Sequence, residues 1–361
     1  MIRYLDTGSI TEGRIDEIQT LYPGVDKIPS RARRKASVGD ILFSTVRPNQ
    51  KHYGIIEAGT ENLLVSTGFT VVTVDTTIAD PYFIYYYLTQ SSVIESLQAI
   101  AEQSTSTYPS IKPSDIEDIE LDLPELETQK KIGSTLRMLD RKIALNEEIN
   151  DNLMQQAAAL FSSLYDRTNT EVRFTDLIQI LGGGTPKTGE NTYWNGNIAF
   201  FTPKDVGTPY TLITEKTITA EGLSHCNSRL YPVNTVFVTA RGTVGKVGMS
   251  GVPMAMNQSC YALVGKETHQ LLVYFYTLKA VDRLKHKASG AVFDAITTRD
   301  FESEQIMKLS DDDAKAFLCI AEPMFQKVLN NCIENLRLST LRDSLLPKLM
   351  SGEIDVSAVQ L

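Results

Sequence analysis

The feature that most constrains the fold is a helical pattern that occurs twice in the chain, 185 residues apart. Apolar or asparagine side chains alternate steps of four and three residues, which is the spacing of a seam between two packed helices. The first copy comprises Ile132, Leu136, Leu139, Ile143, Asn146, Asn150, Leu153, Ala157, Leu160 and Leu164. The second comprises Phe317, Ala321, Met324, Val328, Asn331, Asn335, Leu338, Arg342, Leu345 and Leu349. The chain therefore contains two copies of one long helix.

Both copies place asparagines at the same two seam positions: Asn146 and Asn150 match Asn331 and Asn335. A seam asparagine costs stability unless it finds a hydrogen-bonding partner, and its usual role is to fix register and orientation. We therefore predict that the helices pack against each other and that these four are helix-pairing residues. Each helix of ~40 residues would be ~60 Å long. The alternative is two separate helices, each packed on its own domain.

The segments before the two helices also match. They are Val38–Arg47 with Pro232–Arg241, Ile84–Tyr87 with Val273–Tyr276, and Ile111–Ile116 with Ile296–Phe301. The first pair is rich in β-forming residues and ends in arginine, and the second pair begins a helix in each half. The sequence thus predicts a mixed α/β domain followed by a long helix, twice.

Two segments lie outside this repeat. Residues Asp166–Val172 are polar and are predicted to be a linker. Because Ile198–Phe201 aligns with Ile2–Leu5, the stretch from Asp176 to Trp194 has no counterpart in the first half. We expect the first domain to be short, with the equivalent segment missing or supplied from elsewhere.

Composition limits the class of protein. The chain has 361 residues, 42% hydrophobic and 22% charged, which fits two or three globular domains with several buried cores. No run approaches the ~18 apolar residues of a membrane span, and no signal peptide is visible, so the cytoplasm is the expected compartment. Four cysteines without CxxC spacing and four scattered histidines favour structural roles over a metal site.

Charge is distributed unevenly along the chain. Lys and Arg minus Asp and Glu give 9 − 12 = −3 for residues 1–110 and 8 − 14 = −6 for 111–180. The same count gives 12 − 8 = +4 for residues 181–300 and 6 − 10 = −4 for 301–361. The helical segments are therefore the more acidic ones, which suits helices that face protein and domains that face phosphate.

A glycine-rich loop with two cations follows a predicted strand at residues 239–248, including Arg241 and Lys246. It lacks the spacing of a P-loop or a dinucleotide-binding motif. The alternatives are a plain hairpin with glycine turns and a loop whose cations reach phosphates or a base edge, which arginine can bond with two donors. We favour the second, because Arg47 and Lys51 recur at the same place in the other half.

A further candidate is the basic cluster of Arg31, Arg33, Arg34 and Lys35, directly before a predicted strand. Two polar turns, at residues 66–68 and 257–259, are candidates as well. The alternative roles are a solvated turn for the cluster and caps or plain turns for the other two. The polar loops Ser104–Tyr108 and Ser289–Phe293, each with one aromatic residue, are contacts or merely turns. The predicted DNA-binding set is Arg31, Arg33, Arg34, Lys35, Thr45, Arg47, Lys51, Lys204, Thr239, Arg241, Lys246, Asn257 and Gln258.

Catalytic motifs are missing from the sequence. There is no paired-carboxylate pattern, no nucleophile elbow and no (Asn/Asp)-Pro-Pro-(Tyr/Phe) motif of an amino-methyltransferase. We therefore predict no catalytic residues.

Three motifs carry a resemblance to a known family. They are Leu123-Pro124 before Glu127–Ile132, Gly183–Pro186 with Tyr193-Trp194, and the ending Leu341–Ile354. Together with the repeat, they make the chain similar to the specificity (S) subunits of type I restriction-modification systems. This resemblance implies an α+β (mixed α/β) fold with two target recognition domains separated by two long antiparallel coiled-coil helices, an internal pseudo-two-fold repeat. The corresponding division is 1–124 and 167–310 for the domains, 125–166 for the first helix and 311–361 for the second helix and tail.

The resemblance also implies a function and partners. Each domain would read one half of a bipartite double-stranded DNA site, with the helices as a spacer, and the chain would be a non-catalytic recognition subunit. Two modification (M) subunits would methylate adenine, and restriction (R) subunits would join in some systems. No cofactor is expected on this chain, because S-adenosylmethionine, ATP and Mg²⁺ would belong to the partners. The alternatives are a self-sufficient DNA-modifying enzyme and a coiled-coil scaffold that binds only protein.

Overall fold

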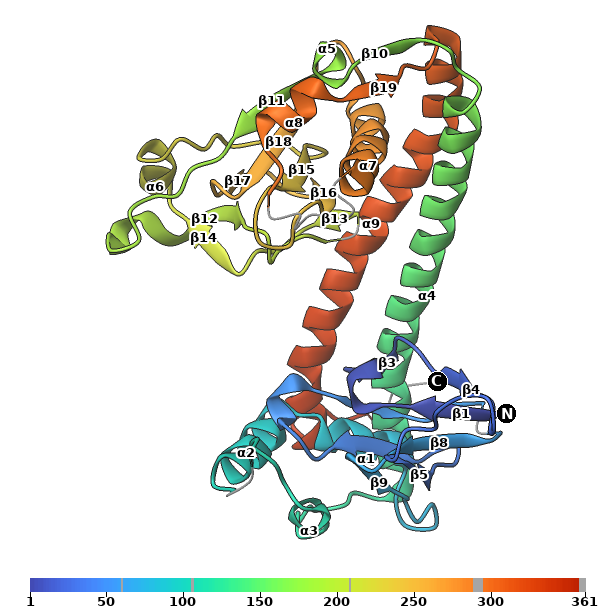
Figure 1. The fold of residues 1–361 in the computed structure, drawn as a ribbon. Helices are drawn as coiled ribbons and strands as arrows, with labels where there is room; N and C mark the ends of the chain where they lie inside the picture. Colours follow the sequence, from blue (N-terminus) through green and yellow to red (C-terminus); the bar gives the residue numbers. More distant parts are fainter. Residues whose placement is uncertain (60, 105–106, 208, 288–294, 357–361) are drawn as a thin grey trace. The chain divides into compact units, whose positions relative to one another are not determined.

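The computed structural model describes residues 1–59, 61–104, 107–207, 209–287 and 295–356. The chain forms two compact units, and each takes part of both long helices (Figure 1). Unit 1 comprises Met1–Ile143 with Arg337–Leu361, and unit 2 comprises Ala144–Leu336. This differs from the predicted division, which gave each helix a segment of its own. Packing divides the helices because each domain rests on one part of α4 and one part of α9.

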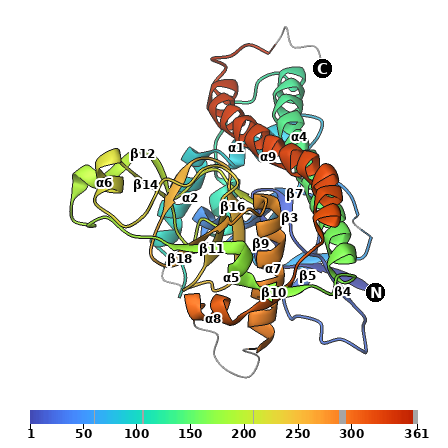
Figure 2. The same cartoon turned by 90° about the horizontal axis from the view of Figure 1, so that it is seen from above.

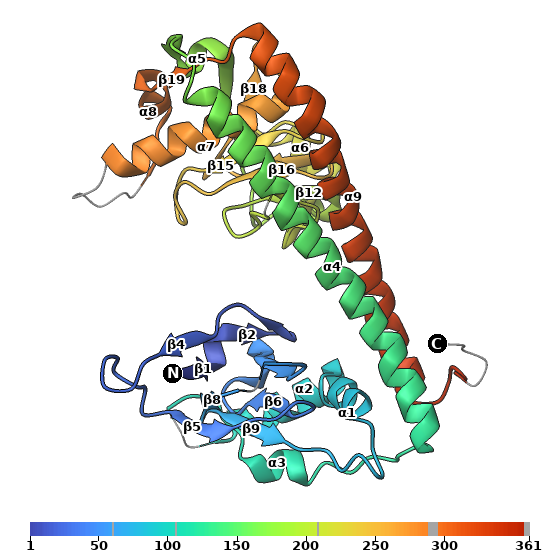
Figure 3. The same cartoon turned by 90° about the vertical axis from the view of Figure 1, so that its right-hand side faces the viewer.

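The predicted helix pair is present. Helices α4 (Leu126–Tyr165) and α9 (Asp311–Met350) lie side by side and run in opposite directions, as Figures 1, 2 and 3 show. All twenty predicted seam positions are buried or half-buried, and none is exposed. The heptad spacing therefore identified the contacting faces of both helices.

The seam asparagines bond from one helix to the other inside unit 2. Asn146 Nδ2 donates to Oδ1 of Asn335 and to Oε2 of Glu334, both at 2.8 Å. Asn331 Nδ2 donates to Oδ1 of Asn150, also at 2.8 Å. Because Asn146 and Asn331 are fully buried, a slip of one helix turn would leave these amides without partners.

The described residues of the unit 1 domain form two small sheets and a two-stranded pair, β2-β3. The first has the order β4-β1-β8-β5, and the second has the order β7-β6-β9. The strands are β1 (Ile2–Leu5), β2 (Ile10–Thr11), β3 (Arg14–Ile15), β4 (Gln19–Leu21), β5 (Ala32–Lys35), β6 (Ile41–Ser44), β7 (Tyr53–Ile55), β8 (Leu63–Ser66) and β9 (Phe69–Val72). The helices are η1 (Thr7–Ser9), η2 (Pro48–Gln50), α1 (Pro81–Leu88), α2 (Ser91–Glu102) and α3 (Pro113–Glu117).

The domain of unit 2 follows the same plan with more strands. Its main sheet has the order β11-β18-β15-β16-β13, beside a sheet β14-β12-β17 and a pair β10-β19. The strands are β10 (Glu171–Arg173), β11 (Ile178–Gly182), β12 (Trp194–Phe201), β13 (Tyr210–Thr211), β14 (Lys216–Ile218), β15 (Val236–Thr239), β16 (Val247–Ser250), β17 (Met254–Met256), β18 (Cys260–Gly265) and β19 (Gln305–Met307). The helices are α5 (Phe174–Leu177), η3 (Asn191–Tyr193), α6 (Ala220–Ser224), α7 (Gln270–Lys287) and α8 (Thr298–Ser303).

The strand order in the two domains follows the repeat in the sequence. Strand β6 lies between β7 and β9, as β15 lies between β16 and β18, and the parallel pair β1-β8 matches the parallel pair β12-β17. The segment without a counterpart forms β11, which pairs along β18. The predicted linker is wrong at its end, because Glu171 and Val172 belong to β10 and pair with β19.

Side chains at the start of α4 hold the domain of unit 1 on that helix. Gln129 is almost fully buried. Its Nε2 donates to the carbonyls of Ile78 and Pro124, and its Oε1 accepts from the N–H of Asp80 at 2.9 Å. Gly133 lies one turn later, where a Cβ would come within 2.6 Å of Asp80 Oδ1. The beginning of α1 therefore docks where α4 has no side chain.

The asparagine pair predicts a measurable coupling. Replacing Asn150 with Ala leaves the buried Asn331 amide without its acceptor, and we expect a loss of about 1–3 kcal/mol in the free energy of unfolding. Urea unfolding of the single variants and of the double variant Asn150→Ala with Asn331→Ala gives the coupling energy. Purely additive losses would contradict this interpretation.

Candidate nucleic-acid interface

Each domain has an arginine just after the central strand of a sheet, but the predicted alignment of these arginines is wrong by one residue. The N–H of Ile111 donates to the carbonyl of Thr45 as the N–H of Ile296 donates to that of Ala240, so Arg241 corresponds to Val46 and Arg47 lies one residue further along. In unit 1 the chain leaves β6, and the N–H of Arg47 donates to the carbonyl of Pro109 at 2.9 Å, next to a bridge between Val46 and Ser110. In unit 2 the chain leaves β15, and Arg241 forms a bridge with Ala295. Each arginine therefore projects from a loop that a later segment of its own domain holds by backbone hydrogen bonds.

The loop of unit 1 is held in a tight conformation. Arg47 and Lys51 flank η2 and have φ values of 50° and 57°, a left-handed conformation that non-glycine residues rarely adopt. The Arg47 guanidinium lies over the ring of Tyr108, 5.0 Å from its centre. Lys51 forms an ion pair with Glu12, and both side chains are half-exposed. The loop thus presents a cation whose direction is set by an aromatic ring.

The turn at residues 66–68 connects the basic cluster of unit 1 with the end of β6 by hydrogen bonds. The N–H of Thr67 donates to the carbonyl of Arg31 at 2.9 Å, and the Thr45 hydroxyl donates to the carbonyl of Gly68 at 2.9 Å. The structure therefore brings Arg31 and Thr45 together around residues 66–68, with Thr45 only half-buried.

The prediction for this cluster needs one correction. Residues Ala32–Lys35 do not precede a strand but form β5 itself. Strand alternation exposes Arg33 and Lys35, whereas Arg34 is half-buried and its Nη1 donates to the carbonyl of Phe69. Arg34 therefore supports the domain from inside rather than offering a free cation.

The loop of unit 2 is a hairpin between β15 and β16, in which Arg241 and Lys246 are exposed. The N–H of Ala240 donates to the carbonyl of Ser259 at 2.8 Å, and Thr243 contacts the carbonyl of Pro203. The hairpin thus lies beside the turn that contains Asn257 and Gln258 and beside the turn that leads to Lys204.

Thr239 differs from its predicted role, because its side chain is fully buried. Its hydroxyl donates to the carbonyl of Thr243 and accepts from the N–H of Lys246 at 2.9 Å. Gly242 and Gly245 have φ values of 85° and 74°, and a Cβ on Gly245 would meet the Lys285 side chain. Thr239 therefore closes the hairpin from beneath instead of touching a ligand.

Three other predicted side chains already have partners within unit 2. Lys204 lies 3.6 Å from Glu215 and is largely exposed, so this ion pair is weak. Asn257 Oδ1 accepts from the N–H of Ser259 at 3.0 Å and shapes its own turn. Gln258 is exposed and accepts from the Thr185 hydroxyl.

Sequence reasoning missed the residues that support these turns. Gly183 approaches the backbone so closely that a Cβ would lie 2.1 Å from the carbonyl oxygen of Asn257, and the N–H of Gly184 donates to the carbonyl of Met256. The glycine run was visible in the sequence, but its target was not. In unit 1, Tyr108 was recognised only as part of a polar loop, and the matching loop Ser289–Phe293 lies outside the described residues.

The surroundings of these loops offer structural thiols and no metal site. Among the described residues, no group of three or more His, Cys, Asp and Glu side chains could hold a metal ion. Burial raises the pKa of Cys260, which follows the Asn257 turn, to about 12, so its thiol stays protonated and unreactive at neutral pH. No helix in the described part of the chain has the length and apolar character needed to cross a bilayer.

Comparison with known proteins decides the family. A family profile described as "Type I restriction modification DNA specificity domain" matches residues 33–155 and again residues 167–308. The chain belongs to this family. The first match contains the Arg47 loop and most of α4, and the second contains the Arg241 loop and ends before α9 begins.

Relatives agree with this assignment over nearly the whole specificity subunit. The type I restriction enzyme HindI specificity subunit of Haemophilus influenzae is 25% identical over 433 residues, covering 97% of this chain and 94% of its own. The MjaIX specificity subunit of Methanocaldococcus jannaschii is 22% identical and covers 88% and 78%. A crystal structure of the S subunit from M. genitalium has the same fold, with a TM-score of 0.59, 17% identity and coverage of 96% and 88%.

The chain is therefore the DNA-recognition subunit of a type I restriction-modification system and is not itself the catalytic subunit. Nothing in the comparisons supports the two alternatives, a self-sufficient DNA-modifying enzyme and a scaffold that binds only protein. The individual contact residues stay predictions, because sequence likeness to a family does not name the side chains that read a particular target.

The buried threonine gives a test of loop support in the specificity subunit. Thr239→Val removes the acceptor of the Lys246 N–H and the donor to Thr243, so we expect faster amide exchange at residues 240–246 and a loss of about 1–3 kcal/mol in stability. Thr239→Ser keeps the hydroxyl and is the matched control. Equal exchange rates in the two variants, followed by mass spectrometry, would contradict a specific role of the hydroxyl.

Proposed function

We propose that this specificity subunit recognises a bipartite double-stranded DNA target, with one half-site read by each domain. The observation that carries the proposal is that an arginine follows the central strand in both units, after β6 and after β15, and that the same backbone hydrogen bonds hold Thr45 and Ala240 just before it. Two copies of one reading element suit two half-sites.

The side chains of the loops suit different parts of DNA. Arginine can donate two parallel hydrogen bonds to the O6 and N7 atoms of guanine, so Arg47 and Arg241 are the proposed base readers. Lys51 and Lys246 are proposed to contact phosphates, which adds affinity that falls with salt concentration. Arg31, Arg33 and Lys35 extend this phosphate surface along β5 in unit 1.

The long helices are the proposed docking surface for modification subunits. Outside their seam they expose large apolar side chains, namely Met138 and Leu145 on α4 and Ile320 and Leu341 on α9. Exposed apolar side chains on an acidic helix pair suit a protein partner better than DNA. We propose that two modification subunits bind there, hold S-adenosylmethionine and methylate adenine, and that ATP and Mg²⁺ act on restriction subunits where these join.

The base-reading role predicts a position-specific loss. Arg241→Ala should weaken binding of the target by about 1–3 kcal/mol and relax preference at one base pair of one half-site, and Arg47→Ala should do so in the other. The target is first defined by mapping methylated adenines in the host genome with and without the gene. Binding is then measured by fluorescence anisotropy with the co-expressed modification subunits.

Lys266→Ala is the matched control for these variants. It removes one exposed cation at the opposite end of β18 from the Ser259 turn, and its Nζ bonds only the carbonyl of Thr175 among the contacts described. An equal loss of affinity in all three variants would contradict a reading role for the two arginines. Complexes that assemble and bind normally without both arginines would favour the scaffold alternative.

The helix surface predicts a separate defect. Leu145→Glu should reduce the affinity for modification subunits by about tenfold or more, because it places a charge in the proposed apolar contact. Co-purification and sedimentation of the complex measure the loss, and circular dichroism checks that the helices remain folded. Asp151→Asn, an exposed change on the same helix, is the control and should leave assembly unchanged.

A further inference from the structure

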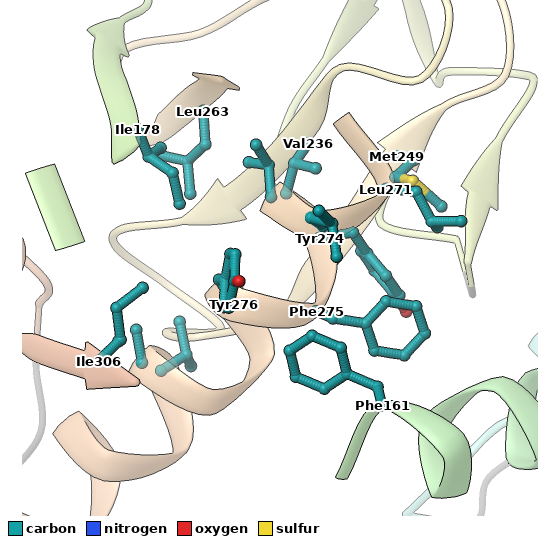
Figure 4. Packing of buried hydrophobic residues seen from close by; sticks show 14 of the residues in the cluster. Phe161, Ile178, Val236, Met249, Leu263, Leu271, Tyr274, Phe275, Tyr276 and Ile306 are labelled. Atoms are coloured by element: carbon teal, nitrogen blue, oxygen red, sulfur yellow. The ribbon is translucent and has the colours of Figure 1, made fainter. Parts of the chain in front are cut away.

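The contact between domain and helices in unit 2 is built from aromatic rings. Phe275 of α7 stacks on Phe161 of α4 with centroids 5.0 Å apart, and it meets Phe317 and Phe325 of α9 edge-on at 5.2 and 5.6 Å. All four side chains are buried. Figure 4 shows Phe161 pointing from its helix toward Phe275, beside Tyr274 and Tyr276. We call these four residues the aromatic box.

The same contact in unit 1 is polar. The Tyr86 hydroxyl of α1 donates to Asp140 Oδ2 of α4 at 2.5 Å, and Arg342 Nη1 of α9 donates to Asp140 Oδ1 at 2.7 Å. Arg342 also bonds Asp343 at 2.9 Å. Burial first and then the negative charge of Asp140 raise the pKa of Tyr86, so its hydroxyl remains the donor at neutral pH. We call Tyr86, Asp140 and Arg342 the polar triad.

The polar triad and the aromatic box occupy the same places in the repeat. The 185-residue offset of the helices and the match of Ile84–Tyr87 with Val273–Tyr276 relate the following pairs: Tyr86 and Phe275, Asp140 and Phe325, Arg342 and Ala157, Leu346 and Phe161, Ile132 and Phe317. Around the triad, unit 1 has a cavity of about 480 Å³. Tyr53, Tyr85 and Leu346 contribute to its lining, whereas the rings of unit 2 pack against one another.

This difference matters because each domain faces two homologous places to dock. Both are formed by one part of α4 and one part of α9, and the seam pattern is the same in each. Shape and hydrophobic burial alone would distinguish them poorly, because homologous helix surfaces offer homologous grooves.

We propose that the polar triad and the aromatic box determine docking specificity, so that each recognition domain packs on its own part of the helix pair. If the domain of unit 1 docked in the other place, the Tyr86 hydroxyl would be buried against Phe325 and Ala157 without an acceptor. If the domain of unit 2 docked against the triad, Phe275 would cover Asp140 and Arg342 without the hydrogen bond that Tyr86 supplies. The first mismatch buries the Tyr86 hydroxyl without an acceptor, and the second deprives Asp140 Oδ2 of its tyrosine donor.

A practical consequence follows for exchange of recognition domains between the two positions. A transplanted domain should dock firmly only if the helix residues beneath it are changed to match. The matched set for a second copy of the unit 2 domain in the first position is Asp140→Phe, Arg342→Ala and Leu346→Phe. Together with Phe275 of the domain, it supplies three of the four rings of the aromatic box, with Ile132 in the place of Phe317.

The test crosses two domains with two helix surfaces in full-length chains. One chimera carries residues 167–310 in place of residues 1–125, joined to α4, and both the chimera and the natural chain are made with and without the three helix substitutions. Amide exchange is measured at residues 132–143 and 342–349. We expect the substitutions to slow exchange by about tenfold or more in the chimera and to accelerate it in the natural chain.

Opposite changes in the exchange rate in the two chains support the proposed docking specificity, because a general change in helix stability would act in the same direction in both. The same sign in both chains would overturn the proposal. If the chimera fails to fold, Tyr86→Phe in the natural chain answers the question. It should accelerate exchange in the natural background and have little effect beside Asp140→Phe and Arg342→Ala, and additive effects would overturn the proposal.

Discussion

The antiparallel seam between α4 and α9 is the contact on which both units depend. Each domain packs on a surface that exists only when the two helices lie in one register. The amides of Asn146, Asn150 and Asn331, which are buried, and of Asn335, which is half-buried, define that register in unit 2. A purely apolar seam would tolerate sliding by a heptad, because leucine and valine interdigitate equally well after the shift. Hydrogen bonds between buried amides do not tolerate it, so the polar interruption of the seam stabilises a single arrangement.

The domains use this support to hold exposed side chains on rigid backbone. In both units the arginine loop leaves the central strand of a sheet and is joined to a later segment of the same domain by main-chain hydrogen bonds. The supports differ in detail, since Tyr108 covers Arg47 whereas the Thr239 hydroxyl closes the hairpin of Arg241. The side chains proposed to read DNA are thus distinct from the backbone contacts that hold their loops.

The helices and the repeat could be predicted from the sequence because their period is regular and long. All seam positions were found by spacing alone, and the family motifs then indicated DNA recognition. The match of the strands β6 and β15 was also found, but with an error of one residue in their alignment. The predictions for single side chains were less reliable. Nothing local distinguishes Thr239, which is buried, from Thr45, which is half-buried. Arg34 is half-buried because it lies within β5, where alternate side chains point to opposite faces. Such differences depend on contacts between distant segments, which one sequence does not reveal.

The closed hairpin after β15 has a consequence for how targets change over time. Its shape depends on a hydroxyl beneath it, on two glycines and on main-chain bonds to Ser259 and Ala295, and none of these involves the outward side chains of Arg241 or Lys246. Substitutions at the tip are therefore nearly silent for folding. If the proposed reading role of Arg241 holds, the target preference can therefore change through substitutions at the tip without loss of the fold.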